Sequence, residues 1–346
     1  MKPKSIATTT LLTILTILLF SAPLKAATPL PSWQEGPAKT RIITFVNKVC
    51  DAKSPDYVKP ADRIAVFDND GTMWCEKPLY FQLLYVFHRI KGLAPQHPEW
   101  RTTQPFKAVI ENDRKALRAS GVKGLLQLVA ATHAGISEQE FADSVRQWAA
   151  KARHPRFHKL FTELTFVPMQ ELVDYLSTNG FTCFIVSGGG TGFMRVLLPE
   201  LYSVPTWRIL GSYAKTAFKN GEIVHLPENA FINNGPNKPL AIDREIGKRP
   251  ILACGNSDGD LAMLQYAAAG KAPSLELLVH HTDAEREYAY DRQSRVGTLD
   301  KGLDYGRAHN WLIVDMKKDW KKIFAPVGPG PKTRERTPAK ARSNPE

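Results

Sequence analysis

Three short apolar segments, each followed at once by glycine or polar residues, organise this sequence. Residues 64–67, 181–186 and 250–254 are rich in branched and aromatic side chains and show no polar alternation. This pattern is typical of strands buried on both faces of a parallel sheet. Segments with helical periodicity lie between them, and strands that alternate with helices predict a doubly wound α/β fold. In such folds, ligands bind beyond the carboxyl ends of the strands.

The helical patterns divide the chain into two predicted domains. They fall at 38–49, 80–90, 105–118, 122–132, 137–152, 169–178, 193–198, 238–246 and 261–269. From residue 85 to about 160 the chain is helix-like throughout, and Ser137 with Glu140 forms a capping box. Because this run interrupts the α/β pattern, we predict an inserted, mainly α-helical cap domain at residues 85–160. Residues 27–84 and 161–325 would then form the parallel-sheet core.

Two shorter patterns predict further elements of the core. Residues 209–225 contain Asn220-Gly221, which favours the tight turn of a β-hairpin. Residues 311–314 are apolar enough to form a late strand. No internal repeat is evident in the sequence.

Both ends of the chain differ in composition from the rest. Lys2 and Lys4 precede an apolar run at 11–20, and the small residues Ala26 and Ala27 follow. This order predicts a signal peptide at residues 1–26, and the run is shorter than the ~20 residues that span a bilayer. We therefore expect an exported protein, periplasmic in a bacterium with two membranes, with no stable membrane anchor after cleavage. Residues 326–346 are rich in proline, glycine and charge, which predicts a disordered tail.

The composition and net charge of the chain limit which kinds of binding partner are expected. Hydrophobic residues make up 43% of the chain and charged residues 23%, as in ordinary globular proteins. The formal net charge of +12 is concentrated partly in the leader and the tail. We find no basic surface interleaved with aromatic residues, so nucleic acid is not an expected partner, although the excess charge would attract anionic substrates. The sequence predicts no particular oligomeric state.

The four cysteines show neither a disulfide framework nor a metal-binding spacing. Cys183 and Cys254 lie inside apolar strand-like runs and are expected to be buried small hydrophobic residues. A bridge between Cys50 and Cys75 remains an open alternative.

Two carboxylates stand where the first predicted strand ends. Asp68 and Asp70 follow the apolar residues 64–67 and are separated by one residue, which turns both side chains toward the same side of an extended segment. Two acids so close repel each other unless a cation offsets the repulsion. Mg²⁺ is the usual cation in such sites, because it prefers oxygen ligands and is often held by one or two carboxylates plus a phosphate.

The run Asp68-Asn69-Asp70-Gly71-Thr72 resembles the nucleophile motif Asp-x-Asp-Gly-Thr of the haloacid-dehalogenase-like (HAD) hydrolase superfamily, most of whose members are phosphatases. The resemblance implies that Asp68 attacks phosphorus and that Asp70 protonates the leaving group. Dehalogenases of this superfamily generally lack the second Asp, so Asp70 and Thr72 favour phosphatase chemistry. The resemblance also implies a Rossmann-like core.

The second predicted strand ends in a turn similar to the second motif of that family. Residues 184–189 read Phe-Ile-Val-Ser-Gly-Gly. The resemblance implies that Ser187 binds the transferring phosphoryl group, together with backbone N–H groups at Gly188 and Gly189. The start of the following helix would favour the anion's negative charge.

The third strand is followed by residues 255–260, Gly-Asn-Ser-Asp-Gly-Asp, which resemble the acidic fourth motif that completes the Mg²⁺ site. The usual form is Gly-Asp with another acid four residues on, but this chain has Asn256 at the first position and Asp260 at the second. An Asn carbonyl oxygen can bind Mg²⁺ without adding charge, and Asp258 is the alternative ligand. For the third motif, a lysine, we choose Lys238, with Lys248 as the alternative.

The resemblance implies an exported, Mg²⁺-dependent phosphomonoester hydrolase that forms an aspartyl-phosphate. Asp68, the backbone carbonyl of Asp70 and the acidic loop would hold the metal. A helical insert between the first two motifs is most similar to the phosphoserine-phosphatase branch, and the substrate would be a small phosphorylated metabolite. Trp74 and Glu76 are candidate substrate contacts, with Glu76 pairing with an ammonium or choline-like group.

Two other functions share this sequence pattern. A non-catalytic exported binding protein that retains the fold is favoured only by Asn256, and the intact Asp68 and Asp70 oppose it. A phosphotransferase with an alcohol acceptor would use the same residues as a hydrolase.

Overall fold

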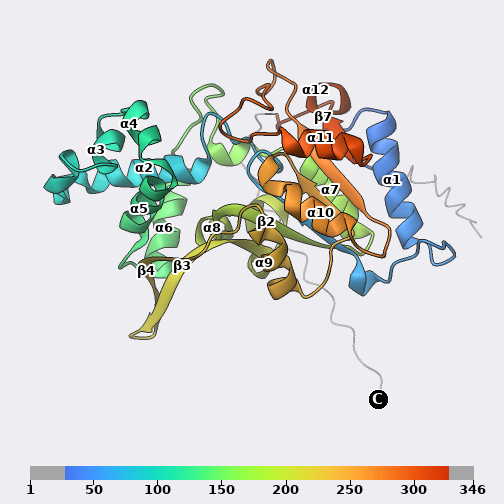
Figure 1. The fold of residues 1–346 in the computed structure, drawn as a ribbon, viewed down its shortest axis with the longest axis horizontal. Coiled ribbons are helices and arrows are strands. Elements are labelled where there is room, and N and C mark those ends of the chain that lie inside the picture. The colour runs from blue at the N-terminus through green and yellow to red at the C-terminus, as the bar shows by residue number, and fades with distance from the viewer. Residues whose placement is uncertain (1–27, 327–346) are drawn as a thin grey trace, which may run out of the picture.

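A seven-stranded sheet in the order β4-β3-β2-β1-β5-β6-β7 forms the centre of the molecule (Figure 1). The computed structural model describes residues 28–326. The strands are β1 (Ile64–Phe67), β2 (Thr182–Gly190), β3 (Ile209–Lys219), β4 (Glu222–Phe231), β5 (Leu252–Gly255), β6 (Leu275–His280) and β7 (Leu312–Asp315). Every neighbouring pair is parallel except β3 with β4. The predicted α/β fold with a parallel core sheet is confirmed. The predicted signal peptide and, beyond residue 326, the predicted tail lie outside the described residues.

Helices cover both faces of this sheet. In chain order they are α1 (Pro37–Cys50), α2 (Phe81–Leu93), α3 (Phe106–Ile110), α4 (Arg114–Ala119), α5 (Gly121–His133), α6 (Glu138–Ala149), α7 (Val167–Thr178), α8 (Thr191–Tyr202), α9 (Asn237–Ile246), α10 (Leu261–Ala268), α11 (Lys301–Ala308) and α12 (Met316–Asp319).

Successive side chains of β1 point to opposite faces, as the pleat of a strand requires. Ala65 and Phe67 pack in one hydrophobic cluster with residues of α1 and α7. Ile64 and Val66 pack in a second cluster with residues of α9, α10 and α11. All four residues of β1 are buried, which explains why the sequence shows an apolar run without alternation.

The sheet extends beyond the predicted strands in two places. β2 continues through Ser187 to Gly190, because Gly190 pairs with Ser212 of β3 after an irregularity in the register. β6 was not predicted, since Glu276 interrupts its apolar run, yet it pairs with both β5 and β7.

The chain between β1 and β2 is helical, and helices α2 to α6 lie to one side of the sheet (Figure 1). The predicted helix at 105–118 is two helices, α3 and α4. Asn112 adopts a positive φ of 58°, and the Asp113 side chain then accepts hydrogen bonds from the backbone of Lys115 and Ala116 to start α4. The predicted boundary between residues 84 and 85 falls inside α2, and the domain boundaries remain a prediction.

The predicted hairpin is present and is longer than expected. Strands β3 and β4 pair antiparallel around the Asn220-Gly221 turn and project toward the helical cap (Figure 1). The backbone of His225 in β4 exchanges hydrogen bonds of 3.0 and 3.2 Å with Gly135 and Ile136 in the cap. The hairpin therefore joins the core sheet to the cap.

All four cysteines are free thiols, so the alternative of a Cys50–Cys75 bridge is wrong. The Cys50 thiol donates to the backbone carbonyl of Asn179 at 3.4 Å, and the Cys75 thiol donates to Glu287 at 3.0 Å. Cys183 and Cys254 are buried, as predicted. Among residues 28–326, no helix has the length and apolar character needed to cross a membrane.

Candidate active site

A buried lysine lies between two carboxylates at the carboxyl edge of the sheet. Lys238 Nζ is 2.6 Å from Asp68 Oδ1 and 2.6 Å from Asp260 Oδ1. Asp68 follows β1, Asp260 lies just before α10, and Lys238 is the second residue of α9. Three segments far apart in the sequence are thus joined by one ammonium group.

Burial and repulsion both disfavour charge on Asp68. Burial raises the pKa of Asp68 to about 7, the neighbouring Asp260 carboxylate adds to the rise, and Lys238 opposes it. Burial alone would lower the pKa of Lys238, but the carboxylates of Asp260 and Asp68 outweigh it, so its pKa is raised. Lys238 therefore carries a permanent positive charge beside the predicted nucleophile.

The structure brings Lys238, rather than the alternative Lys248, to the site. Lys248 lies on the surface, where its ammonium pairs with Asp62 at 2.8 Å and contacts the carbonyl of Ala61. That pairing makes Lys248 a suitable control residue for experiments on Lys238.

Asp70 is oriented by an indole. Trp74 Nε1 donates a hydrogen bond of 2.7 Å to Asp70 Oδ1. Burial raises the pKa of Asp70 to about 6, and the Trp74 hydrogen bond acts in the opposite direction. Trp74 itself is 1% exposed and packs against Phe81 with ring centroids 4.9 Å apart. The predicted substrate contact through Trp74 does not match this position, because the indole lies in the core and holds Asp70.

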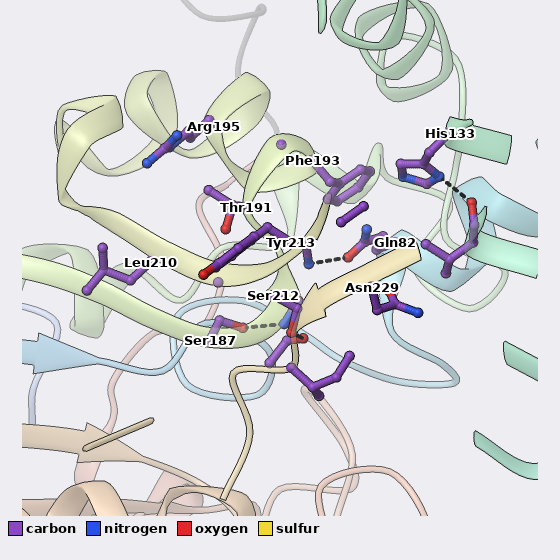
Figure 2. A pocket seen from close by; sticks show the side chains of 18 of the residues that line it. Gln82, His133, Ser187, Thr191, Phe193, Arg195, Leu210, Ser212, Tyr213 and Asn229 are labelled. Atoms are coloured by element: carbon purple, nitrogen blue, oxygen red, sulfur yellow. Dashed lines mark hydrogen bonds between the residues drawn. The ribbon is translucent and has the colours of Figure 1, made fainter. Parts of the chain in front are cut away.

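The last residues of β2, Ser187 to Gly190, form a glycine-rich segment beside these acids, where the sequence predicts a turn. Ser187 Oγ accepts a hydrogen bond of 3.1 Å from the backbone N–H of Gly189. Gln82, from α2, accepts one of 2.6 Å from the backbone N–H of Gly190. Figure 2 shows the Ser187 and Gln82 side chains on either side of this turn, near Tyr213 of the hairpin. Ser187, Gly188 and Gly189 all line the same cavity as Asp68 and Lys238.

Asp258 is turned away from the acidic cluster, contrary to the prediction that it could bind the metal. Its carboxylate accepts hydrogen bonds of 2.8 to 3.2 Å from the backbone N–H groups of Asp300, Lys301 and Gly302. Asp300 is the N-cap residue of α11, and Lys301 and Gly302 belong to its first turn. N–H groups at the start of a helix have no partner within it and need other acceptors. Asp258 therefore caps α11, and it does not line the cavity.

Asn256, the other candidate ligand, is buried between two polar side chains and, like Asp258, is not among the residues that line the cavity. Its Oδ1 accepts from the Thr72 hydroxyl at 3.0 Å, and its Nδ2 donates to Glu76 Oε1 at 2.8 Å. Glu76 also accepts from the Tyr290 hydroxyl at 2.7 Å and is 1% exposed. Glu76 lines the cavity, but its position beside Asn256 differs from that expected for a group that contacts a substrate's distant ammonium.

A cavity of about 760 Å³ connects this polar base to the cap and the hairpin. Its cap wall, formed by α5 and α6, is mainly apolar and includes Leu125, Leu126, Val129, Ala130 and Phe141. The charged Arg146, Arg195 and Arg244 also line the cavity. His133, whose pKa burial lowers to about 4, is neutral at physiological pH.

The residues at the base of the cavity fit a hard divalent cation. Asp68 Oδ1 is engaged by Lys238, whereas Asp68 Oδ2 accepts no hydrogen bond from the described residues. Asp70, Asn256 and Glu76 offer further oxygen atoms, the donors that Mg²⁺ prefers. Within residues 28–326, no three His, Cys, Asp or Glu side chains converge as a metal site. A cation here would therefore need a backbone or amide oxygen as well as carboxylates.

Sequence reasoning missed several residues of the site. Asp260 was recognised as the second acid of its motif, but was not assigned a role, although it engages Lys238. Gln82 and Tyr290 lie in segments without a motif, so no signal in the sequence pointed to them. Apolar residues of α5 carry only helical periodicity, which predicts a buried face but not a cavity wall.

The fold and the site together define a hydrolase of the α/β class with an acidic centre under a helical cap. A model of the haloacid dehalogenase-like hydrolase family matches residues 65–265, more than half of the 346-residue chain. The protein therefore belongs to this family, and the predicted superfamily is confirmed.

Other comparisons show only distant likeness. No curated protein sequence matches. A conserved protein of unknown function from Anaerococcus prevotii DSM 20548 is 17% identical over 70% of this chain and 85% of its own, with a TM-score of 0.49. A protein of unknown function from Bordetella pertussis Tohama I is 14% identical over 73% of this chain and 98% of its own, with a TM-score of 0.47. A phosphoserine phosphohydrolase-like protein from Francisella tularensis is 18% identical over 64% of this chain and 89% of its own, with a TM-score of 0.36.

The cap role of Asp258 leads to a first prediction. Replacing Asp258 by Ala removes the acceptor for three N–H groups of α11, so we expect the free energy of unfolding to fall by about 1–2 kcal/mol. Chemical denaturation measures this loss. Because the carboxylate lies outside the cavity, Mg²⁺ affinity and turnover per folded molecule should stay within about twofold of the wild type. A large loss of metal binding with unchanged stability would restore Asp258 as a ligand.

Proposed function

We propose that this protein is an exported, Mg²⁺-dependent phosphomonoester hydrolase. The observation that carries the proposal is the Lys238 ammonium, 2.6 Å from both Asp68 and Asp260, next to the Ser187 glycine turn in one cavity. In this arrangement Asp68 is the carboxylate nucleophile and Asp70 is the second acid. The Lys238 ammonium and the backbone N–H groups after Ser187 would bind the anionic phosphoryl group. Burying carboxylates costs free energy because they lose their hydration. A protein that only binds its ligand would gain nothing from that cost.

In the proposed reaction, a carboxylate oxygen of Asp68 attacks phosphorus and the bond from phosphorus to the leaving oxygen breaks. Asp70 gives its proton to that oxygen, which matches its raised pKa of about 6. Asp70 then takes a proton from the water that attacks the aspartyl-phosphate, and phosphate leaves. Lys238, the Ser187 hydroxyl and the backbone N–H groups of the turn stabilise the phosphoryl oxygens throughout.

Mg²⁺, when bound, would reduce the repulsion between the Asp68 carboxylate and an anionic phosphate. The residues that would hold it are Asp68, the backbone carbonyl of Asp70 and Asn256. The role of Trp74 is then to fix the Asp70 carboxyl group for proton transfer through its 2.7 Å hydrogen bond.

The cap wall of the cavity favours a substrate whose leaving group is partly apolar. The α5 and α6 wall presents Leu125, Leu126, Val129 and Phe141 to the space above the catalytic acids. Glu76, the predicted partner of an ammonium group, is engaged by Asn256 and Tyr290 instead. An aryl or alkyl phosphomonoester therefore fits better than phosphoserine or phosphorylcholine.

The proposed function predicts phosphate release that depends on Asp68. Wild-type protein with Mg²⁺ should hydrolyse p-nitrophenyl phosphate, and Asp68→Asn should lose at least about 10³-fold in kcat because an amide cannot act as the nucleophile. The variant should still fold, since Lys238 keeps its contact with Asp260. Release of nitrophenolate measures turnover, and circular dichroism checks the fold.

Lys238→Met and Lys248→Met form a matched pair for the same assay. We expect Lys248→Met to keep full activity, because its ammonium pairs only with surface groups. Absence of turnover in the wild type at high enzyme concentration would contradict a hydrolase and favour a binding protein. Phosphate transfer to added glycerol in place of release would indicate a phosphotransferase.

The apolar wall predicts a substrate preference. In a panel of phosphomonoesters, kcat/KM should be at least about tenfold higher for 1-naphthyl phosphate than for phosphoserine, since burial of an aromatic ring contributes about 1.5–3 kcal/mol. Leu126→Asp should raise KM for the naphthyl ester. Gln127→Asp, on the exposed face of the same helix, is the control for added charge. A preference for phosphoserine would contradict this substrate class.

Export is the remaining part of the proposal, and it is supported by the leader at residues 1–26. Expression of the full chain in a bacterium with two membranes should give a shortened protein in the periplasmic fraction. N-terminal sequencing should find the new terminus near residue 27. A full-length protein in the cytoplasmic fraction would contradict export.

A further inference from the structure

Glu76 is a buried carboxylate that the reaction described above does not use. Only 1% of the residue is exposed, and within residues 28–326 no Lys, Arg or His side chain pairs with it within 4.0 Å. Lys77, its neighbour in sequence, points elsewhere: its ammonium bonds to the carbonyl of Val296 and lies over the Tyr290 ring. An isolated charge in such a place is costly unless something compensates it.

Its two oxygen atoms have different surroundings. Glu76 Oε1 accepts hydrogen bonds from Asn256 Nδ2 at 2.8 Å and from the Tyr290 hydroxyl at 2.7 Å. Glu76 Oε2 accepts none from the described residues, and the side chain lines the cavity together with Asp68 and Asp70. Burial raises the pKa of Glu76 well above its usual range, and the carboxylates of Asp70 and Asp68 add to the rise. The charges of Asp68 and Asp70 therefore act on Glu76 within the same cavity.

Two glycines from distant segments make room for Glu76. A Cβ atom on Gly71, which has a φ of +77°, would overlap both Asn256 Nδ2 and Glu76 Oε1. A Cβ atom on Gly297, with a φ of +67°, would overlap Glu76 Oε1. The backbone therefore excludes any side chain that would separate the Glu76 carboxylate from the Asn256 amide.

The separation of Glu76 and Asn256 suits two ligands of one cation. The amide oxygen and nitrogen of an Asn can exchange places by a flip of the group. In this structure Asn256 Nδ2 donates to Glu76 Oε1 at 2.8 Å and Asn256 Oδ1 accepts from the Thr72 hydroxyl at 3.0 Å, so Oδ1 would face Glu76 only after such a flip. Two oxygens bound to one octahedral Mg²⁺ at ~2.0–2.1 Å are about 2.9 Å apart. Asn256 and Glu76 therefore lie close enough together to be ligands of one cation.

We propose that Glu76 binds the divalent cation of the active site beside Asn256, and that it supplies the negative charge which Asn256 lacks. The family's pattern has an acid at the position of Asn256. In this chain Glu76, in the loop after β1, would take the place of that acid. This inference rests on the proposed Mg²⁺-dependent function, since it assigns a further ligand to the same cation.

The test moves the charge between positions 76 and 256 and measures metal binding without substrate. Free Mn²⁺, followed by its electron paramagnetic resonance signal, reports the Kd for Mn²⁺ of each folded protein. Glu76→Gln should weaken Mn²⁺ binding about tenfold or more, because the site loses a charged ligand. Asn256→Asp alone should tighten it. The double variant Glu76→Gln/Asn256→Asp should return to within about threefold of the wild type, since it restores one acid to the pair.

Glu138→Gln is the matched control, because Glu138 lines the same cavity from the cap, where it begins α6. We expect its Kd for Mn²⁺ to equal that of the wild type. Thermal melting adds a second readout. In EDTA, Glu76→Gln should melt at or above the wild-type temperature, because it removes a buried, unpaired charge, while its gain in Tm on adding Mg²⁺ should be smaller than that of the wild type.

The outcomes separate this inference from the proposed function. If the wild type binds Mn²⁺ and Glu76→Gln binds it equally well, Glu76 is not a ligand and only this inference fails. Unchanged Mn²⁺ binding combined with a higher KM for an ammonium-bearing phosphoester would show that Glu76 binds substrate, which also overturns it. If the wild type binds neither Mn²⁺ nor Mg²⁺, the metal-dependent hydrolase itself fails. Should Glu76→Gln not fold, weaker Mn²⁺ binding in Asn256→Asp would overturn the inference.

Discussion

The ion contacts of Lys238 are the interaction on which the site depends. One ammonium, 2.6 Å from Asp68 and 2.6 Å from Asp260, joins the end of β1, the start of α9 and the segment before α10. Removing one partner of a buried ion pair costs about 3–5 kcal/mol, because the other charge stays buried. The geometry of the site is therefore coupled to the packing of these three segments. A change that breaks the contacts of Lys238 should also lower the free energy of unfolding. The same ammonium is available to an anion that approaches Asp68.

The parallel sheet makes this convergence possible. β1, β2 and β5 are neighbours in the order β2-β1-β5 and run in the same direction, so the segments after Phe67, Val186 and Gly255 emerge at one edge. The hairpin β3–β4 then extends the sheet toward the cap and contacts it through the backbone of His225. The core, the hairpin and the cap line this cavity together. The apolar cap wall and the acids at the edge of the sheet therefore lie on one continuous surface.

Residues whose role depends on a strand end could be predicted from the sequence, whereas residues defined by a distant partner could not. Asp68 and Ser187 follow apolar runs, and Lys238 begins a periodic helix, so pattern and motif place all three. Asp258 stands in an acidic motif, but its partners are backbone groups at residues 300–302, which carry no sequence signal. β6 was missed because Glu276 breaks its apolar run, although the residue is buried. The prediction that Trp74 contacts the substrate failed because aromatic residues occur both in cores and at binding sites, and the sequence does not separate the two.

Under the proposed function, the balance of charge at the base of the cavity would link the binding of a divalent cation to the binding of the substrate. Lys238 pairs with Asp68 and Asp260, while Asp70 and Glu76 line the same cavity. Burial raises the pKa of Asp68, Asp70 and Glu76. A phosphate monoester, itself anionic, would meet strong repulsion from these groups if all were ionised. Protons on the acids could relieve the repulsion, but a protonated Asp68 is no longer a nucleophile. A divalent cation relieves it while Asp68 stays ionised, so the cation and the substrate should bind with positive coupling, and each should raise the affinity of the other by the same factor.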